Sequence, residues 1–82
     1  MYEIEFSKTA EKQFYKFGRD IQVRILSALE RVKVRPQHYI ERFVGSKYYK
    51  LRIGNYRVIL DIQEHKLIIF VIELGHRRNI YD

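Results

Sequence analysis

The chain has no cysteine, one proline and four glycines among its 82 residues. Without cysteine, it can form neither a disulfide framework nor a cysteine-based zinc site. Because proline is rare and no low-complexity or linker-like segment is present, we expect the chain to be folded throughout. The predicted organisation is one domain over residues 1–82, close to the smallest size at which a single core sustains a fold.

Long apolar segments are also absent. The longest apolar run, residues 67–72, is far shorter than the roughly 20 residues needed to cross a bilayer. The first residues, Met-Tyr-Glu-Ile-Glu, lack the basic and then apolar pattern of a signal peptide. We therefore expect a cytoplasmic protein with no membrane association.

Acidic residues are scarce in the middle of a chain whose net charge is +6. Eight lysines and arginines stand between Arg31 and Arg57, against one acid, Glu41. Such a basic sector favours nucleic acid or an acidic protein as the partner. The same charge run could also be a solvated surface with no specific partner.

Hydrophobic periodicity predicts a strand followed by two helices. Residues 2–6 alternate apolar and acidic side chains, as a half-buried strand does. Ser7 can cap a helix that ends at Gly18, and Asp20 is expected to cap a second helix that ends before Pro36. The short connection predicts an antiparallel αα-hairpin. The second helix should bury a stripe formed by Ile21, Ile25, Ala28, Leu29 and Val32.

Three strands are predicted after a loop over residues 37–47. They span about 48–53, 56–63 and 67–74, and the third is expected to be central because it is apolar on both faces. Gly54-Asn55 forms the tight turn between the first two strands. The expected fold class is α+β, with the order β-α-α-β-β-β, an antiparallel-dominated sheet and the αα-hairpin packed on one face.

The hairpin turn places Arg52 directly opposite Arg57, with Lys50 two residues along the same face. Like charges that face each other across strands destabilise a sheet, so an anion between them is expected. A three-residue turn would pair Gln63 with Leu67 and place Glu73 beside Arg57. The third strand would then contribute to the core Ile68, Phe70, Ile72 and Leu74. The uncovered face would carry four cations around one carboxylate, namely Lys50, Arg52, Arg57 and, by extrapolation, Arg77.

Converging guanidinium and ammonium groups suit a phosphodiester, because donors fixed in advance stabilise the charge that develops in its transition state. The three histidines are far apart, and neither metal-ligand spacing nor a Ser-His-Asp or Cys-His nucleophile is visible. We therefore expect no metal and no cofactor. RNA suits such a site because its own 2′-hydroxyl can act as the nucleophile.

Several motifs resemble the RelE family within the RelE/ParE superfamily of toxins, over nearly the whole chain. They are Tyr49-Lys50-Leu51-Arg52, Gly54-Asn55-Tyr56-Arg57-Val58-Ile59, Phe70-Val71-Ile72, and Gly75-His76-Arg77-Arg78 followed by Tyr81. The resemblance implies the toxin of a type II toxin–antitoxin system that enters the ribosomal A site and cuts messenger RNA there by 2′-hydroxyl attack. It also implies a RelB-like antitoxin that wraps around the toxin, with the ribosome and messenger RNA as further partners.

The resemblance also implies roles for single residues. Lys50 matches a lysine implicated in the chemistry, and Arg57 and Arg77 match the arginines that grip the scissile phosphate. Tyr81 matches a tyrosine that stacks on or orients the target nucleotide.

A second lysine of the family is Tyr48 in this chain, which leaves the identity of the general base open. His76 becomes a possible proton donor to the leaving 5′-oxygen, because imidazole titrates near neutral pH. Tyr48, Arg52 and Arg78 are expected to bind RNA. Each of these side chains could instead be an ordinary surface residue.

Two other functions remain open at this point. The chain could be a ParE-like toxin that poisons DNA gyrase and cuts no RNA, or a non-catalytic basic module that binds RNA or an acidic partner. The cations together with Tyr81 favour the ribonuclease, because gyrase inhibition needs no phosphodiester chemistry.

Overall fold

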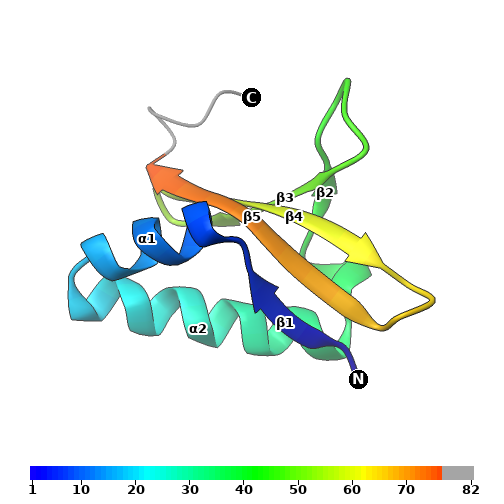
Figure 1. Cartoon of the computed structure of the whole chain (residues 1–82), viewed down its shortest axis with the longest axis horizontal. Helices are drawn as coiled ribbons and strands as arrows, with labels where there is room; N and C mark the ends of the chain where they lie inside the picture. The colour runs from blue at the N-terminus through cyan, green and yellow to red at the C-terminus, as the bar shows by residue number, and fades with distance from the viewer. Residues whose placement is uncertain (77–82) are drawn as a thin grey trace.

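The computed structural model describes residues 1–76. Along the chain these form β1 (Glu3–Phe6), α1 (Lys8–Lys16), α2 (Arg19–Val34), the 3-10 helix η1 (Pro36–His38), β2 (Glu41–Arg42), β3 (Tyr49–Ile53), β4 (Tyr56–Gln63) and β5 (Ile68–His76). The five strands make one sheet in the order β1-β5-β4-β3-β2. Both helices lie on the same face of this sheet, while β2 and the loop that follows it rise on the other side (Figure 1).

The predicted α+β fold class is confirmed. Three of the four strand pairs are antiparallel, and only β1 and β5 run parallel. Two details differ from the prediction. The segment 37–47, predicted as a loop, contains part of η1 and the short strand β2. The middle strand is β4, whereas β5 lies between β4 and the edge strand β1.

The helix ends follow local capping chemistry. The Ala10 N–H donates to the Ser7 hydroxyl oxygen at 2.9 Å, which confirms Ser7 as the cap of α1. The prediction that Asp20 caps α2 is wrong, because α2 begins at Arg19 and its N-cap is Gly18. Asp20 instead lies in the first turn, where a carboxylate is favourable next to the positive end of the helix dipole.

The core lies between the helices and the inner face of the sheet. The predicted α2 stripe is confirmed, with Ile21 partly buried and its other members fully so. The predicted β3–β4 register is confirmed as well, including Arg52 opposite Arg57. Gly54 has a φ of 58° and Asn55 does not have a positive φ, as in a type II′ turn. The buried core is formed by Ala10, Phe14, Ile25, Ala28, Leu29, Val32, Leu51, Ile53, Val58, Leu60, Ile69, Val71 and Leu74.

The predicted register between β4 and β5 is wrong at the turn. Gln63 pairs with Ile68 and not with Leu67, because the connecting turn has one residue more than predicted. Leu67, at the end of this turn, adopts a φ of 55°. The shift by one residue turns Ile69 and Val71 towards the core, so that Ile68, Phe70 and Ile72 are not in it.

A β-bulge then restores the predicted facing of the end of β5. Leu60 pairs with Val71 but Ile59 pairs with Glu73, so β5 carries one extra residue at this point. Leu74 is therefore buried, as predicted, and Glu73 lies on the same face as Ile59 and Arg57. The two one-residue shifts add to two, so Glu73 keeps its predicted face but lies opposite Ile59 and not opposite Arg57.

Side chains from the start of the chain bind this part of β5. The Ser7 hydroxyl donates to the Ile72 carbonyl oxygen at 2.7 Å, and the Leu74 N–H donates to Gln13 Oε1 at 2.6 Å. β1 pairs with β5 only as far as Val71, so these two side chains continue the edge where β1 ends. Within residues 1–76, no helix combines the length and the apolar character that crossing a membrane requires.

Candidate functional site: a basic cavity on the outer sheet face

Three of the predicted cations meet on the face of the sheet that is turned away from the helices. Lys50, Arg52 and Arg57 line one cavity of about 70 Å³, together with Tyr39, Glu41 and Leu51. Because a water molecule takes up roughly 30 Å³ of liquid, the cavity has room for a small anionic group of a larger ligand. The hairpin register creates this meeting, since Arg52 pairs with Arg57 and Lys50 follows two residues along.

The cations differ in exposure. Arg57 is 3% exposed, Lys50 is half-buried and Arg52 is exposed. The prediction of an uncovered face is therefore wrong around Arg57, where Ile59 on the same face is also buried. Burial removes water from the guanidinium of Arg57, so its attraction for an anion is screened less than that of Arg52. The cavity thus has a sheltered cation at its base and an exposed one at its rim.

Sequence reasoning missed Glu41 as a member of the site. Glu41 on β2 pairs directly with Lys50 on β3 and lines the same cavity. The sequence did single out Glu41 as the one acid between Arg31 and Arg57. A two-residue strand has no periodicity, however, so the sequence could not show that Glu41 lies opposite Lys50. Glu73, the carboxylate that was predicted, is exposed and pairs with Ile59, while Arg57 pairs with Gly75. Glu73 is therefore a diagonal neighbour of Arg57 on the same face.

His76 lies apart from the cavity. It pairs with Tyr56 at the end of the sheet, and their rings are in edge-to-face contact at 5.4 Å between centroids. Tyr56 has the same parity as Val58, whose side chain faces the helices, so His76 faces them too. It lines a separate hollow with Gln13 and Lys16 of α1 and with Phe17, which follows that helix. The structure therefore does not bring His76 together with Lys50, Arg52 and Arg57.

The remaining predicted site residues are Tyr48 and three residues that follow His76. Tyr48 immediately precedes β3, and its backbone N–H donates to the Ser46 hydroxyl at 2.9 Å. The ammonium of Lys47 lies 5.5 Å from the centroid of its ring, a cation–π contact. Arg77, Arg78 and Tyr81 lie outside the described residues. Within residues 1–76, no group of three or more His, Cys, Asp or Glu side chains is placed to hold a metal ion.

Comparison with known proteins relates this chain to toxins of type II toxin–antitoxin systems. The family model described as "ParE toxin of type II toxin-antitoxin system, parDE" matches residues 4–81. The mRNA interferase toxin RelE of Escherichia coli K12 is 27% identical over 79 residues, which cover 93% of this chain and 83% of that protein.

Solved structures of such toxins share the fold. The intact RelBE toxin–antitoxin complex of E. coli contains a chain with a TM-score of 0.78 and 25% identity, over 93% of this chain and 96% of that one. The RelBE2 complex of Mycobacterium tuberculosis gives a TM-score of 0.82 at 20% identity, covering 93% of this chain and 98% of its own. The archaeal RelE–RelB complex of Pyrococcus horikoshii gives 0.79 at 20% identity, covering 96% and 98%.

The extent of the family match, the toxin relative and the shared fold agree with one another. This chain belongs to the ParE toxin family of type II toxin–antitoxin systems, and within the RelE/ParE superfamily it is a RelE-family toxin.

Proposed function

We propose that this toxin is a ribosome-dependent, metal-independent mRNA interferase, which cuts messenger RNA in the ribosomal A site and so inhibits translation in the cytoplasm. The observation that carries the proposal is the cavity in which Lys50, Arg52 and Arg57 meet on rigid strands. The name of the E. coli relative, an mRNA interferase, supports the same activity.

In the proposed reaction the 2′-oxygen of the target nucleotide forms a bond to the adjacent phosphorus, and the bond from phosphorus to the 5′-oxygen breaks. The 2′-hydroxyl loses a proton to a base, and the leaving 5′-oxygen gains one. The products are a 2′,3′-cyclic phosphate and a free 5′-hydroxyl. Negative charge grows on the phosphoryl oxygens during this step, which is the charge that fixed cations stabilise.

The cavity suggests a role for each of its charged groups. The sheltered guanidinium of Arg57 binds the scissile phosphate, and exposed Arg52 binds a neighbouring phosphate at the rim. Glu41 is a proton acceptor for the 2′-hydroxyl, next to Lys50, whose ammonium then stabilises the developing charge. This assignment makes Glu41 a candidate for the base that the sequence left open.

The remaining roles rest on the family resemblance. Arg77 is proposed to bind the scissile phosphate together with Arg57, Tyr81 to stack on or orient the target nucleotide, and Arg78 to contact RNA. His76 as donor of the leaving-group proton has the least support, because its side chain faces the helices. A RelB-like antitoxin is proposed as the inhibitory partner, since the solved relatives include RelB–RelE complexes.

The experiment uses purified ribosomes carrying a defined messenger RNA codon in the A site, with toxin added in magnesium buffer and no transition metal. The proposal predicts a cut in the A-site codon that leaves a 2′,3′-cyclic phosphate. Lys50→Ala should slow single-turnover cleavage by about 10²–10³-fold, the usual effect of losing one charge-stabilising donor. Lys12→Ala, which removes the same charge from exposed α1, is the matched control. Uncut RNA at saturating wild-type toxin would refute the proposal.

A second function is favoured by the description of the matching family model, which names ParE. Under this alternative the toxin inhibits DNA gyrase and cuts no RNA. A supercoiling assay with purified gyrase separates the two, because the interferase should leave supercoiling unchanged at concentrations that stop translation. Binding to ribosomes with neither cleavage nor gyrase inhibition would instead indicate a non-catalytic basic module.

A further inference from the structure

Three aromatic rings form a row on the helix side of the sheet. The rings of Phe17 and Tyr56 are in edge-to-face contact at 5.3 Å between centroids, and those of Tyr56 and His76 make the same kind of contact at 5.4 Å. The three residues come from different elements, since Phe17 follows α1, Tyr56 begins β4 and His76 ends β5. This aromatic row therefore joins the end of α1 to two neighbouring strands.

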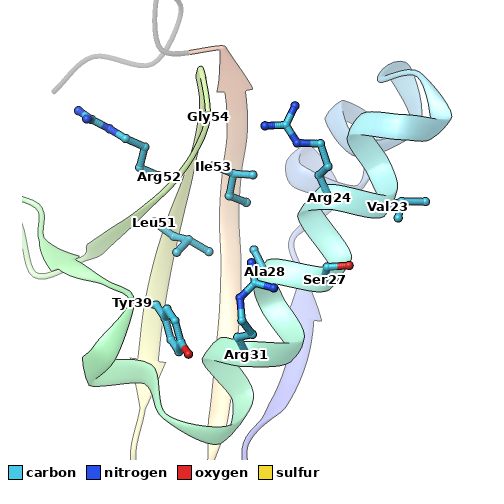
Figure 2. Close-up of a pocket in the computed structure, with 10 residues that line it drawn as sticks. All are labelled: Val23, Arg24, Ser27, Ala28, Arg31, Tyr39, Leu51, Arg52, Ile53 and Gly54. Atoms are coloured by element: carbon cyan, nitrogen blue, oxygen red, sulfur yellow. The ribbon is translucent and has the colours of Figure 1, made fainter.

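The aromatic row lies on the opposite side of the sheet from the basic cavity. On β3, Ile53 points towards α2 and Arg52 points away from it (Figure 2). Tyr56 pairs with Ile53, and Arg57 pairs with Arg52. Because successive side chains of a strand point to opposite faces, Tyr56 is on the helix side and Arg57 is on the outer side. The ring of Tyr56 is thus attached one residue before the sheltered cation of the cavity.

His76, at the end of the row, has the same relation to a second arginine. It pairs with Tyr56 across β4 and β5, and Arg77 is the next residue of the chain. Each residue of this pair therefore comes directly before one of the two arginines that are proposed to bind the scissile phosphate. A shift of either ring moves the backbone of the residue that carries it. The contact between the two rings thus links the backbone positions that precede Arg57 and Arg77.

Phe17, at the other end of the row, is held by the junction of the two helices. Its N–H donates to the Phe14 carbonyl oxygen at 3.2 Å. Gln22 Nε2, on α2, donates to the carbonyl oxygens of Phe14 and Phe17 at 3.2 and 3.0 Å. Carbonyls at the end of a helix lack their regular helical donor, so these bonds stabilise the junction. Because α1 also packs beside β5 (Figure 1), the row starts from a well-anchored position.

Space next to His76 makes its contact with Tyr56 important. A hollow of about 240 Å³ adjoins His76, with Gln13 and Lys16 among its other lining residues. This volume has room for several water molecules at roughly 30 Å³ each. An imidazole that lost its contact with Tyr56 could therefore turn into the hollow. The edge-to-face contact favours one position of the ring.

We propose that the aromatic row positions Arg57 and Arg77 for phosphodiester cleavage, with Tyr56 as the central positioning residue. Catalysis by fixed cations requires that they are held to within about 0.5 Å, and a displacement of about 1 Å can slow a reaction about 10²-fold. His76 then acts through its ring and not through a proton. The inference rests on the proposed function, because it assigns residues that support the proposed cleavage without touching the RNA.

The test measures single-turnover cleavage of A-site RNA over a range of toxin concentrations, well below the melting temperature of every variant. Tyr56→Leu should lower the maximal rate constant by about 10–100-fold and leave the half-saturating toxin concentration within about twofold, because the cations are present but misplaced. Tyr56→Phe keeps the ring and should stay within about threefold of the wild-type rate. Tyr15→Leu is the matched control, since it removes an edge-to-face contact with Phe14 of 5.4 Å on α1 and should not change the rate.

Variants of His76 separate positioning from proton transfer. His76→Leu should slow cleavage by about tenfold. His76→Phe should regain most of this loss and keep the pH profile of the wild type, because a phenyl ring preserves the edge-to-face contact and carries no titrating proton. If His76→Phe is as slow as His76→Leu and one limb of the pH–rate profile disappears, His76 is a proton donor and the inference is overturned.

A double-mutant cycle shows whether the row acts through an arginine. Arg77→Lys keeps a positive charge, which leaves residual cleavage to measure. In this background Tyr56→Leu should slow cleavage by about threefold or less, because the group that it positions is already altered. Equal factors in both backgrounds would overturn the inference, and so would a wild-type rate for Tyr56→Leu alone, while the proposed function would stand. Uncut RNA with the wild-type toxin would instead refute the proposed function, and the positioning role with it.

Discussion

Gln13 binds the end of β5, the strand that comes just before Arg77 in the sequence. Arg77 is predicted to bind the scissile phosphate. Its Oε1 accepts a hydrogen bond from the Leu74 N–H at 2.6 Å, and Leu74 is 2% exposed. β1 pairs with β5 only as far as Val71, so no β1 carbonyl takes this place. We predict that Gln13→Met, which keeps the shape of the side chain and removes the acceptor, destabilises the protein and slows cleavage.

The magnitude follows from the buried donor. Leaving one buried backbone N–H without an acceptor costs about 1–3 kcal/mol. The lower value applies where water reaches the half-buried position of Gln13 and accepts the hydrogen bond from the Leu74 N–H. Unfolding entropy is about 2.1 cal/mol/K per residue, which gives roughly 0.17 kcal/mol/K for a chain of this length. Gln13→Met should therefore lower Tm by about 6–17 °C.

Thermal unfolding followed by circular dichroism measures this shift on the free toxin. Gln13→Glu is the matched control, because its carboxylate can accept the same hydrogen bond, and it should restore most of Tm. Cleavage of A-site RNA, assayed well below both melting temperatures, should fall in Gln13→Met, since the end of β5 is no longer held beside β4. A Gln13→Met variant with the Tm and cleavage rate of wild type would refute this reasoning.

Three further predictions concern the hairpin, the core and the site. Gly54→Ala should lower the free energy of unfolding by about 1–2 kcal/mol, because Gly54 has a φ of 58° and an added Cβ would lie 2.5 Å from Arg24 Nη2. Urea unfolding measures this loss, and an unchanged midpoint would contradict the prediction. Leu60→Ala should cost about 2–5 kcal/mol in the same assay, since Leu60 is fully buried, and a loss below 1 kcal/mol would show that its site collapses freely. Glu41→Gln should keep Tm and slow single-turnover cleavage by about 10²–10⁴-fold, whereas an unchanged rate would remove Glu41 from the role of base.

The local parts of the fold could be predicted because their causes lie within a few residues. Ser7 caps α1 through a bond to a backbone N–H three residues away. The α2 stripe follows from helical spacing alone, and Gly54 fixes the β3–β4 register because the turn it forms is only two residues long. Each of these features depends only on residues that are close in sequence, so it can be predicted without knowledge of the tertiary contacts.

The register of β5 could not be predicted, because it depends on tertiary contacts. The turn before it is one residue longer than expected, which turns Ile69 and Val71 towards the core. The bulge opposite Ile59 and Leu60 then adds a second shift of one residue, which restores the predicted facing of the strand end but not its predicted register. A strand that is apolar on both faces has no alternation from which either shift could be read. Packing against the helices therefore decides which face is buried.

The sequence predicted the part of the candidate site that lies on the β3–β4 hairpin. Parity alone placed Lys50, Arg52 and Arg57 on one face, because all three lie on strands joined by the two-residue turn. Glu41 was missed, since the two-residue β2 is defined by its pairing and not by its own sequence. The burial of Arg57 was missed as well, because strand periodicity assigns a face to a side chain but not the depth at which it lies.

The type II′ turn at Gly54 therefore sets both the register of the β3–β4 hairpin and the placement of its three cations. A slip of β3 by one residue against β4 would move Lys50 and Arg52 to the helix side, away from Arg57, and it would expose Leu51 and Ile53 in exchange. The apolar side of the hairpin stabilises the register in which the arginines oppose each other, although that opposition by itself costs free energy. The core thus holds together the like charges that an RNA phosphate is proposed to neutralise.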